Sequence, residues 1–200
     1  DVDFTTGNIE SNGALTINGS IQPGFKVFSA GDLKIGGSVM SASVTTEANA
    51  VIKGGITGKK SRITSNGDLD IKFIEQGVIE AGGLVVIRSQ AYFSRIRSRS
   101  DIRCHPLSKI MGGSLIAAGY LNVGTVGTPK SEPSLLGAGI DPERLDLYET
   151  TQQELRTRQD ELIQWLQMHG SGRSKKVRTM EAAIDETKLR LLTLNLIPGT

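Results

Sequence analysis

The first two thirds of the chain carry a repeating pattern of apolar and polar positions. In seven consecutive repeats, the positions four and two residues before a turn residue, and two and four residues after it, are never charged. The repeats are 16 to 19 residues long, and their turn residues are Gly13, Gly31, Ala48, Gly67, Gly83, Ser100 and Gly119. Alternation with a period of two predicts short β-strands that each bury one face.

The uncharged positions form four columns when the repeats are aligned. The first contains Ile9, Val27, Val44, Ile63, Ile79, Ile96 and Leu115. The second contains small residues, Ser11, Ser29, Thr46, Ser65, Ala81, Ser98 and Ala117. The third contains Leu15, Leu33, Ala50, Leu69, Val85, Ile102 and Leu121, and the fourth Ile17, Ile35, Ile52, Ile71, Ile87, Cys104 and Val123. A repeat this short must stack on its neighbours to bury its apolar face. The pattern therefore predicts an all-β solenoid, a single-stranded parallel β-helix of about seven coils over residues 1–139.

The turns and the handedness of this β-helix are predicted less directly. An Asp or Asn often follows the turn residue, which favours a turn with left-handed dihedral angles: Asp32, Asn49, Asp68 and Asp101. Between Ile9 and Val39 apolar residues recur every six positions, as in left-handed β-helices, but this interval breaks after Val39. Because left-handed coils depend on regular six-residue sides, we expect a right-handed β-helix, with the left-handed form as the alternative.

Residues 140–200 change to a helical pattern. Asp141-Pro142-Glu143 combines an N-cap acceptor, a proline at the first helical position and an acid in the first turn. Apolar and neutral residues then recur at steps of three and four, at Leu145, Tyr148, Gln152, Leu155, Gln159, Leu162 and Leu166. After a loop around Gly170, Ser171 and Gly172 the spacing continues to Pro198 through Val177, Met180, Ile184, Thr187, Leu191 and Leu194. This predicts an antiparallel α-helical coiled-coil hairpin.

Composition and charge narrow the class of protein. Of the 24 glycines, 20 lie in residues 1–138, which supports a boundary near residue 139. Lys and Arg total 23 and Asp and Glu 21, so the net charge of +2 is too small to indicate an obligatory nucleic-acid or anionic-membrane partner. No apolar run approaches the ~20 residues that span a bilayer. With Cys104 as the single cysteine, we expect a cytoplasmic protein without membrane insertion.

Several phrases of the repeat region resemble the bacterial flagellar assembly protein A family. They are Ser-Ala-Gly-Asp-Leu-Lys-Ile-Gly-Gly at 29–37, Ile-Lys-Gly-Gly-Ile-Thr-Gly at 52–58, Lys-Phe-Ile-Glu at 72–75 and Ile-Glu-Ala-Gly-Gly at 79–83. The resemblance covers residues 3–147, and Arg99 and Ser100 depart from the usual Gly-Gly turn. It implies an N-terminal domain before the β-helix and a helical region after it, so that this chain corresponds to the middle and C-terminal parts. The family is similar in architecture to bactofilins and to the C-terminal domain of MinC, which are non-catalytic cytoplasmic proteins.

The candidate chemical residues indicate no catalysis. Cys104 lies in an inward column, and neither His105 nor His169 has the further ligands that a metal site or the partner that a catalytic base would need. The segment 54–61 suggests a phosphate-binding loop, but Lys60 stands where Ser or Thr is required and no helix follows. We therefore expect no catalytic, metal-binding or cofactor-binding residue and no cofactor.

Five residues are candidates for binding a protein partner. Alternation places Arg95, Arg97 and Arg103 outward, with Tyr92 close before them, as a patch for an acidic protein or polyanion or as an ordinary solvated face. Trp165 either packs between the helices or anchors a partner near the tip of the hairpin.

The resemblance implies a non-catalytic scaffold or adaptor in flagellar assembly or polar localisation. The partner is expected to be a protein, with no nucleic acid. The first alternative is a polymer-forming, bactofilin-like cytoskeletal protein. A carbohydrate-active or acyltransferase β-helix enzyme is the second, and the short coils argue against it. We also expect weak self-association through the first coil or the hairpin, because residues 125–139, with Leu135 and Leu136, can cover the other end of the β-helix.

Overall fold

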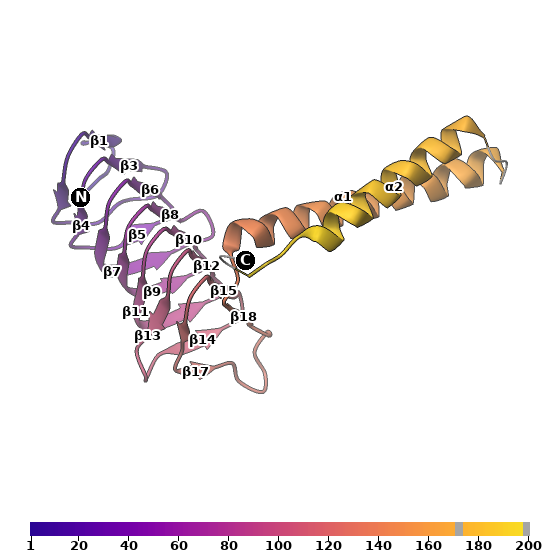
Figure 1. Ribbon diagram of the computed structural model, residues 1–200. Helices are drawn as coiled ribbons and strands as arrows, with labels where there is room; N and C mark the ends of the chain where they lie inside the picture. The colour runs from indigo at the N-terminus through magenta and orange to yellow at the C-terminus, as the bar shows by residue number, and fades with distance from the viewer. Residues whose placement is uncertain (171–173, 198–200) are drawn as a thin grey trace. The chain divides into compact units, whose positions relative to one another are not determined.

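The computed structural model describes residues 1–170 and 174–197. The chain forms two compact units, Asp1–Pro142 and Glu143–Thr200. The first is a parallel β-solenoid and the second consists of two helices (Figure 1). The predicted loop residues Ser171 and Gly172 and the predicted helix stop at Pro198 lie outside the described residues.

The solenoid is built from two parallel sheets whose strands stack coil upon coil. One sheet has eight strands, in the order β1 (Ile9–Ser11), β3 (Lys26–Ser29), β6 (Ser43–Thr46), β8 (Arg62–Ser65), β10 (Val78–Ala81), β12 (Arg95–Ser98), β15 (Ser114–Ala117) and β18 (Leu135–Ala138). The main path of the other sheet contains β2 (Leu15–Ile17), β4 (Leu33–Ile35), β7 (Ala50–Thr57), β9 (Leu69–Glu75), β11 (Val85–Tyr92), β13 (Ile102–Cys104) and β16 (Leu121–Asn122). Three further strands belong to this sheet but lie off its main path: β5 (Val39–Met40), β14 (Lys109–Met111) and β17 (Thr125–Val126). The predicted parallel solenoid of about seven turns is confirmed, and its handedness stays a prediction.

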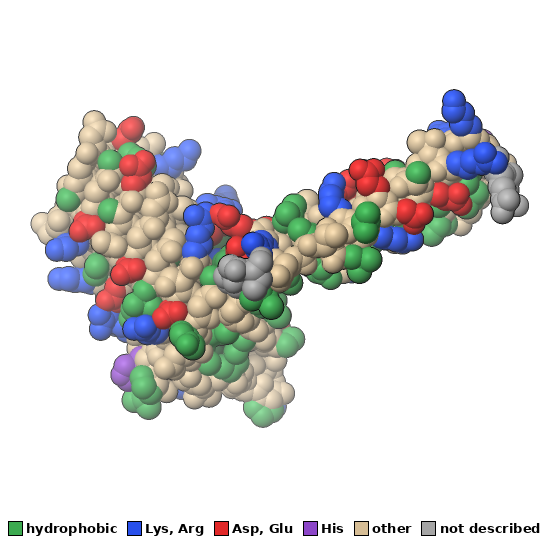
Figure 2. Space-filling view, in the orientation of Figure 1, with side chains coloured by type: hydrophobic (Ala, Val, Ile, Leu, Met, Phe, Trp, Pro, Cys, Tyr) green, Lys and Arg blue, Asp and Glu red, His purple; other side chains and the backbone are tan. Residues whose placement is uncertain are grey.

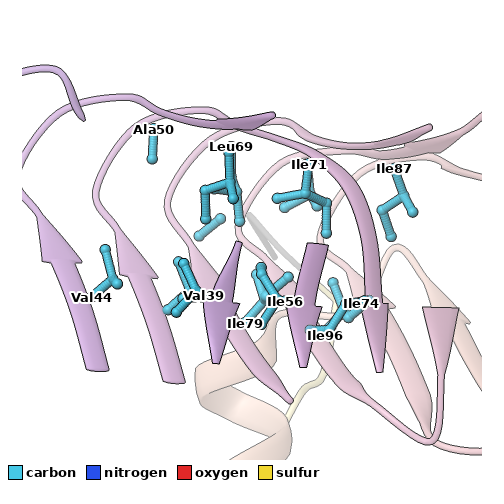
Figure 3. Close-up of a cluster of buried hydrophobic side chains, with 14 of the residues drawn as sticks. Val39, Val44, Ala50, Ile56, Leu69, Ile71, Ile74, Ile79, Ile87 and Ile96 are labelled. Carbon is cyan, nitrogen blue, oxygen red and sulfur yellow. The ribbon is translucent and has the colours of Figure 1, made fainter. Parts of the chain in front are cut away.

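The four predicted columns line the interior of the solenoid. Register pairs such as Ile35 with Ile52 place like residues of successive coils side by side. Of the 28 predicted positions, 23 are buried, and Figure 3 shows several of these side chains pointing into the interior. The half-buried positions belong to the first and last coils: Ile9, Ser11, Leu15, Leu121 and Val123. An end coil has a neighbour on one side only, so its apolar residues keep part of their contact with water.

A further inward column lies on the third side of the solenoid and was not predicted. Its members are at most 1 % exposed: Val2, Ile21, Val39, Ile56, Ile74, Ala91 and Ile110. The interval from the fourth column to this one varies between three residues, from Ile71 to Ile74, and six, from Cys104 to Ile110. Strand β7 has an irregular register between Ile52 and Gly55 that contributes to this variation. A fixed offset from the turn residue therefore misses this side.

The Asp and Asn residues after the turns have another role than the predicted one. None of Asp32, Asn49, Asp68 and Asp101, all within the described residues, has a positive φ. Their side chains instead accept backbone hydrogen bonds from the next coil, as Asn49 Oδ1 does from Asp68 N at 2.9 Å and Asp101 Oδ1 from Tyr120 N at 2.9 Å. Most of the residues with a positive φ in the solenoid lie at a different corner, among them Gly24, Ser41, Gly58, Gln76, Phe93, Gly112 and Gly127.

The small residues of the second column include hydroxyl groups that satisfy buried carbonyls. Ser29 Oγ donates to Gly13 O at 2.8 Å, and Thr46 Oγ1 donates to Gly31 O at 2.8 Å. Ser98 Oγ donates to Gly83 O at 2.7 Å. Since buried polar groups are costly without partners, this column combines the small volume needed at a corner with a bond to the turn carbonyl of the preceding coil.

The segment after residue 124 extends the solenoid by further strands. Strand β17 pairs with β14, and β18 pairs with β15 in the same parallel register as the earlier strands. Leu135 is 57 % and Leu136 38 % exposed. The predicted cover of the C-terminal end is therefore partial, because β18 pairs along β15 and places Leu136 beside Leu115, but Leu135 and Leu136 themselves stay partly exposed.

The second unit contains α1 (Pro142–His169) and α2 (Lys175–Thr193), which lie side by side in Figure 1. Ser174 caps α2 by accepting a hydrogen bond from Val177 N at 3.2 Å. In the described parts of both helices, no stretch is long and apolar enough to cross a membrane.

Polar groups take part in the contact between the helices. Arg158 Nη1 donates to Ala183 O at 2.9 Å, and Arg190 Nη2 pairs with Glu154 Oε2. The prediction that Gln159 contacts the other helix is wrong. Gln159 is exposed, whereas the neighbouring Arg158 is half-buried. A coiled-coil seam remains a prediction.

Candidate protein-interaction surface

The structure separates the arginines that the sequence grouped together. Arg95 begins β12 of the eight-stranded sheet, whereas Arg103 lies in β13 of the other sheet. Both are exposed, and Arg103 Nη2 pairs with Asp101 Oδ2 at 2.9 Å. Alternation along a strand distinguishes inward from outward residues, but it does not tell which side of a solenoid an outward residue faces.

Arg97 is buried, which contradicts its prediction as a solvated outward residue. Its exposed fraction is 8 %, and that of its register neighbour Ile116 is 2 %. Ile116 and Ile140 both crowd Gly137, because a Cβ there would lie 2.8 Å from Ile116 Cδ1 and 2.9 Å from Ile140 Cδ1. The side chain of Ile140, which follows β18, therefore lies against the outer face of this sheet at Gly137. Arg97 is unsuited to a surface patch in this conformation.

The aromatic residues next to Arg95 differ in exposure. Tyr92 ends β11 and is half-buried, in register with Glu75 and Met111. Phe93 follows with a left-handed φ of 50° and is 47 % exposed. The more accessible aromatic group beside Arg95 is therefore Phe93, whereas the sequence pointed to Tyr92.

Trp165 is half-buried and stacks on a residue of its own helix. Its ring lies parallel to that of His169, with centroids 4.6 Å apart and an interplanar angle of 10°. His169 Nδ1 lies 3.1 Å from Trp165 O, within hydrogen-bond distance. One ring face of Trp165 is thus occupied locally, and its role as a partner anchor stays a prediction.

Cys104 and His105 point in opposite directions. Cys104 is buried in the fourth column, and burial raises the pKa of its thiol to about 11, against a smaller lowering by a hydrogen bond to Ser108. His105 is exposed, and its Nδ1 accepts a hydrogen bond from Leu107 N at 3.2 Å. Within residues 1–170 and 174–197, no group of three or more His, Cys, Asp and Glu side chains could hold a metal ion.

The glycines of segment 54–61 serve the contact between coils. A Cβ at Gly54 would collide with Gly37 O, and one at Gly55 would collide with the ring of Phe73. Strand β7 ends at Thr57, whose carbonyl accepts a hydrogen bond from Ser61 Oγ at 2.6 Å. The loop after Thr57 therefore closes on itself and connects β7 to β8.

A second basic group was missed by the sequence reasoning. Lys53, Lys72 and Arg88 each follow directly after a residue of the fourth column and lie on the neighbouring strands β7, β9 and β11. All three are exposed. The aligned repeats contain the signal for this group, because the three cations occupy the same position in three successive repeats. Figure 2 shows basic and acidic side chains distributed over the surface of the solenoid.

Comparison with known protein families identifies the family of this chain. Residues 1–194 match the family described as the Flagellar Assembly Protein A (FapA) beta solenoid domain. Searches of curated proteins and of solved structures found no match. The matched region includes the whole solenoid and both helices, so the chain belongs to the flagellar assembly protein A family.

Proposed function

We propose that this chain is a non-catalytic scaffold or adaptor that acts in the bacterial cytoplasm during flagellar assembly or polar localisation. The observation that carries the proposal is the family match over residues 1–194. Flagellar assembly requires many proteins to be brought together in order, and an adaptor would contribute binding surfaces to this process.

The construction of the solenoid supports a role that depends on its outer surface. Inward side chains such as Ile63, Ile71 and Ile96 are fully buried, so the interior is a packed core. Stacked coils hold outward residues at fixed intervals of about 4.8 Å. We propose Arg95, Arg103, Tyr92 and Trp165 as contact residues for a protein partner, and Arg97 is left out because it is buried.

The test is genetic complementation in a flagellated bacterium that encodes this chain. Deleting the gene should reduce or misplace flagella, counted by electron microscopy, and the wild-type gene should restore them. The variant Arg95→Glu should restore them less well than Lys26→Glu, which changes the charge of another exposed residue at the start of a strand. Normal flagella in the deletion strain would refute the role in assembly.

A second candidate function is end-to-end polymerisation, which the exposed last coil favours. The edge of β18 carries Leu135 and Leu136, and the edge of β17 carries Val126, which is 39 % exposed. Unpaired strand edges with apolar side chains are ready sites for further pairing. Sedimentation over a concentration series should then show weak association that Leu136→Glu abolishes. A monomer at every concentration would exclude this function.

A further inference from the structure

One outward hollow of the solenoid is lined by three basic side chains on successive coils. It has a volume of about 480 Å³ and is lined by Val51, Ile52, Lys53, Asp70, Lys72, Arg88 and Ser89. These residues come from β7, β9 and β11, so the hollow lies entirely within the solenoid. It is called the basic hollow below.

Local strand irregularities shape the basic hollow. Between the register pairs Ile52–Ile71 and Gly55–Phe73, two residues of β7 oppose the single residue Lys72 of β9. The same occurs on the other side, where two residues of β11 oppose Lys72. Lys72 is thus flanked by a bulge on each neighbouring strand. Bulges bend a strand and redirect its side chains, and they are over-represented next to functional sites.

The positive charge of the basic hollow is only partly compensated. Arg88 forms a two-pronged ion pair with Asp70, with Nε–Oδ1 and Nη2–Oδ2 distances of 2.8 and 2.5 Å. Lys53 and Lys72 are exposed and make no ion pair or side-chain hydrogen bond with any residue that the structure describes. Coils stack about 4.8 Å apart, and like charges on neighbouring strands repel. The interaction between Lys53 and Lys72 therefore does not stabilise the solenoid.

We propose that the basic hollow binds an acidic segment of a protein partner, with at least two carboxylates facing Lys53 and Lys72. The inference rests on the proposed function as an adaptor and names the chemistry of one contact. Complementary charge favours such a segment, and the bound carboxylates would relieve the repulsion between the lysines. A single-stranded nucleic acid fits less well, because the lining has no aromatic side chain on which bases could stack.

The test measures binding of a fluorescein-labelled peptide of alternating glutamate and alanine by fluorescence anisotropy, with a glutamine-for-glutamate peptide as the neutral probe. The double variant Lys53→Glu/Lys72→Glu should bind the acidic peptide at least about tenfold more weakly. The matched control is Lys59→Glu/Lys60→Glu, which makes the same change in net charge at two exposed lysines outside the hollow. The control should stay within about twofold of wild type.

Three results would overturn the proposal. The first is equal weakening by both double variants, which would show attraction to net charge alone. The second is tight binding of the glutamine peptide, and the third is stronger binding of single-stranded DNA than of the acidic peptide at equal charge. A failure here with normal complementation of flagella would reject the acidic partner but leave the adaptor function standing.

A melting experiment separates a binding role from a structural one. If the lysines are retained for binding, Lys72→Gln should leave the melting temperature unchanged or raise it by about 1–3 °C, because one repulsive contact is removed. A fall in melting temperature would show that Lys72 supports the fold, and would overturn the proposal.

Discussion

Asp68 Oδ1 accepts a hydrogen bond of 2.8 Å from the backbone N–H of Leu84, which lies one coil further along the solenoid. The backbone N–H of Asp68 itself donates a hydrogen bond of 2.9 Å to Asn49 Oδ1 of the preceding coil. Side chains at this corner therefore continue the ladder of inter-coil hydrogen bonds where the strands are interrupted. The bond is made by the folded chain alone, so its removal should be measurable as lost stability.

Asp68→Ala is expected to lower the stability of the solenoid by about 0.5–1.5 kcal/mol, because the N–H of Leu84 loses its acceptor. Thermal unfolding should show a melting temperature lower by a few degrees. The control is Glu47→Ala at an exposed carboxylate for which, among the described residues, no side-chain hydrogen bond is present. Equal melting temperatures for the two variants would contradict the role of Asp68.

Gly58→Ala should destabilise the solenoid by about 1–3 kcal/mol. Gly58 has a φ of +95°, and a Cβ there would collide with Ser41 Oγ of the preceding coil. Gly13→Ala is the matched control, because Gly13 has no positive φ and a Cβ there would meet nothing within 4 Å. Denaturant unfolding should give a lower midpoint for the first variant only, and a neutral Gly58→Ala would show that this corner tolerates a side chain.

Ile35→Asp tests the buried columns. Ile35 is 1 % exposed and is in register with Ile17 and Ile52. A carboxylate there would be buried without a partner, at a cost of several kcal/mol or the loss of cooperative folding. Lys34→Asp, one residue earlier and exposed, should melt within a few degrees of wild type. Circular dichroism melts compare the two, and an unchanged melt for Ile35→Asp would exclude the column.

The Cys104 thiol should react slowly with iodoacetamide at about pH 8 in the folded chain and rapidly in denaturant. Its pKa is raised to about 11 by burial, so little thiolate forms in the folded state. The unfolded thiol has a pKa of about 8.5 and releases its proton first as pH rises. This group therefore lowers stability progressively above about pH 8.5 and has no such effect below it. Fast native labelling would show that the fourth column opens at this coil.

The hairpin shows how a sequence pattern can select the wrong neighbour. Steps of three and four residues along α1 can place either Gln152 and Gln159 or Thr151 and Arg158 on the face that contacts the other helix. The structure buries Thr151, half-buries Arg158 and exposes Gln159. The choice depends on the partner helix, where Ala183 O is available to Arg158 Nη1, and this group is distant in sequence.

The parallel stacking of the coils follows from the repeat alone, because a short repeat with uncharged columns can bury Ile35, Ile52 or Ile71 only against its own neighbours. The sequence also indicated the start of α1 at Pro142, since capping and proline preferences act within one turn. The surroundings of residues outside the columns, in contrast, result from contacts between parts of the chain that are distant in sequence. The burial of Arg97 and the gathering of Lys53, Lys72 and Arg88 at one hollow depend on coil length, on bulges and on contacts between residues of different coils. Such features determine where residues of different coils lie in space, and no local periodicity of the sequence indicates their effect.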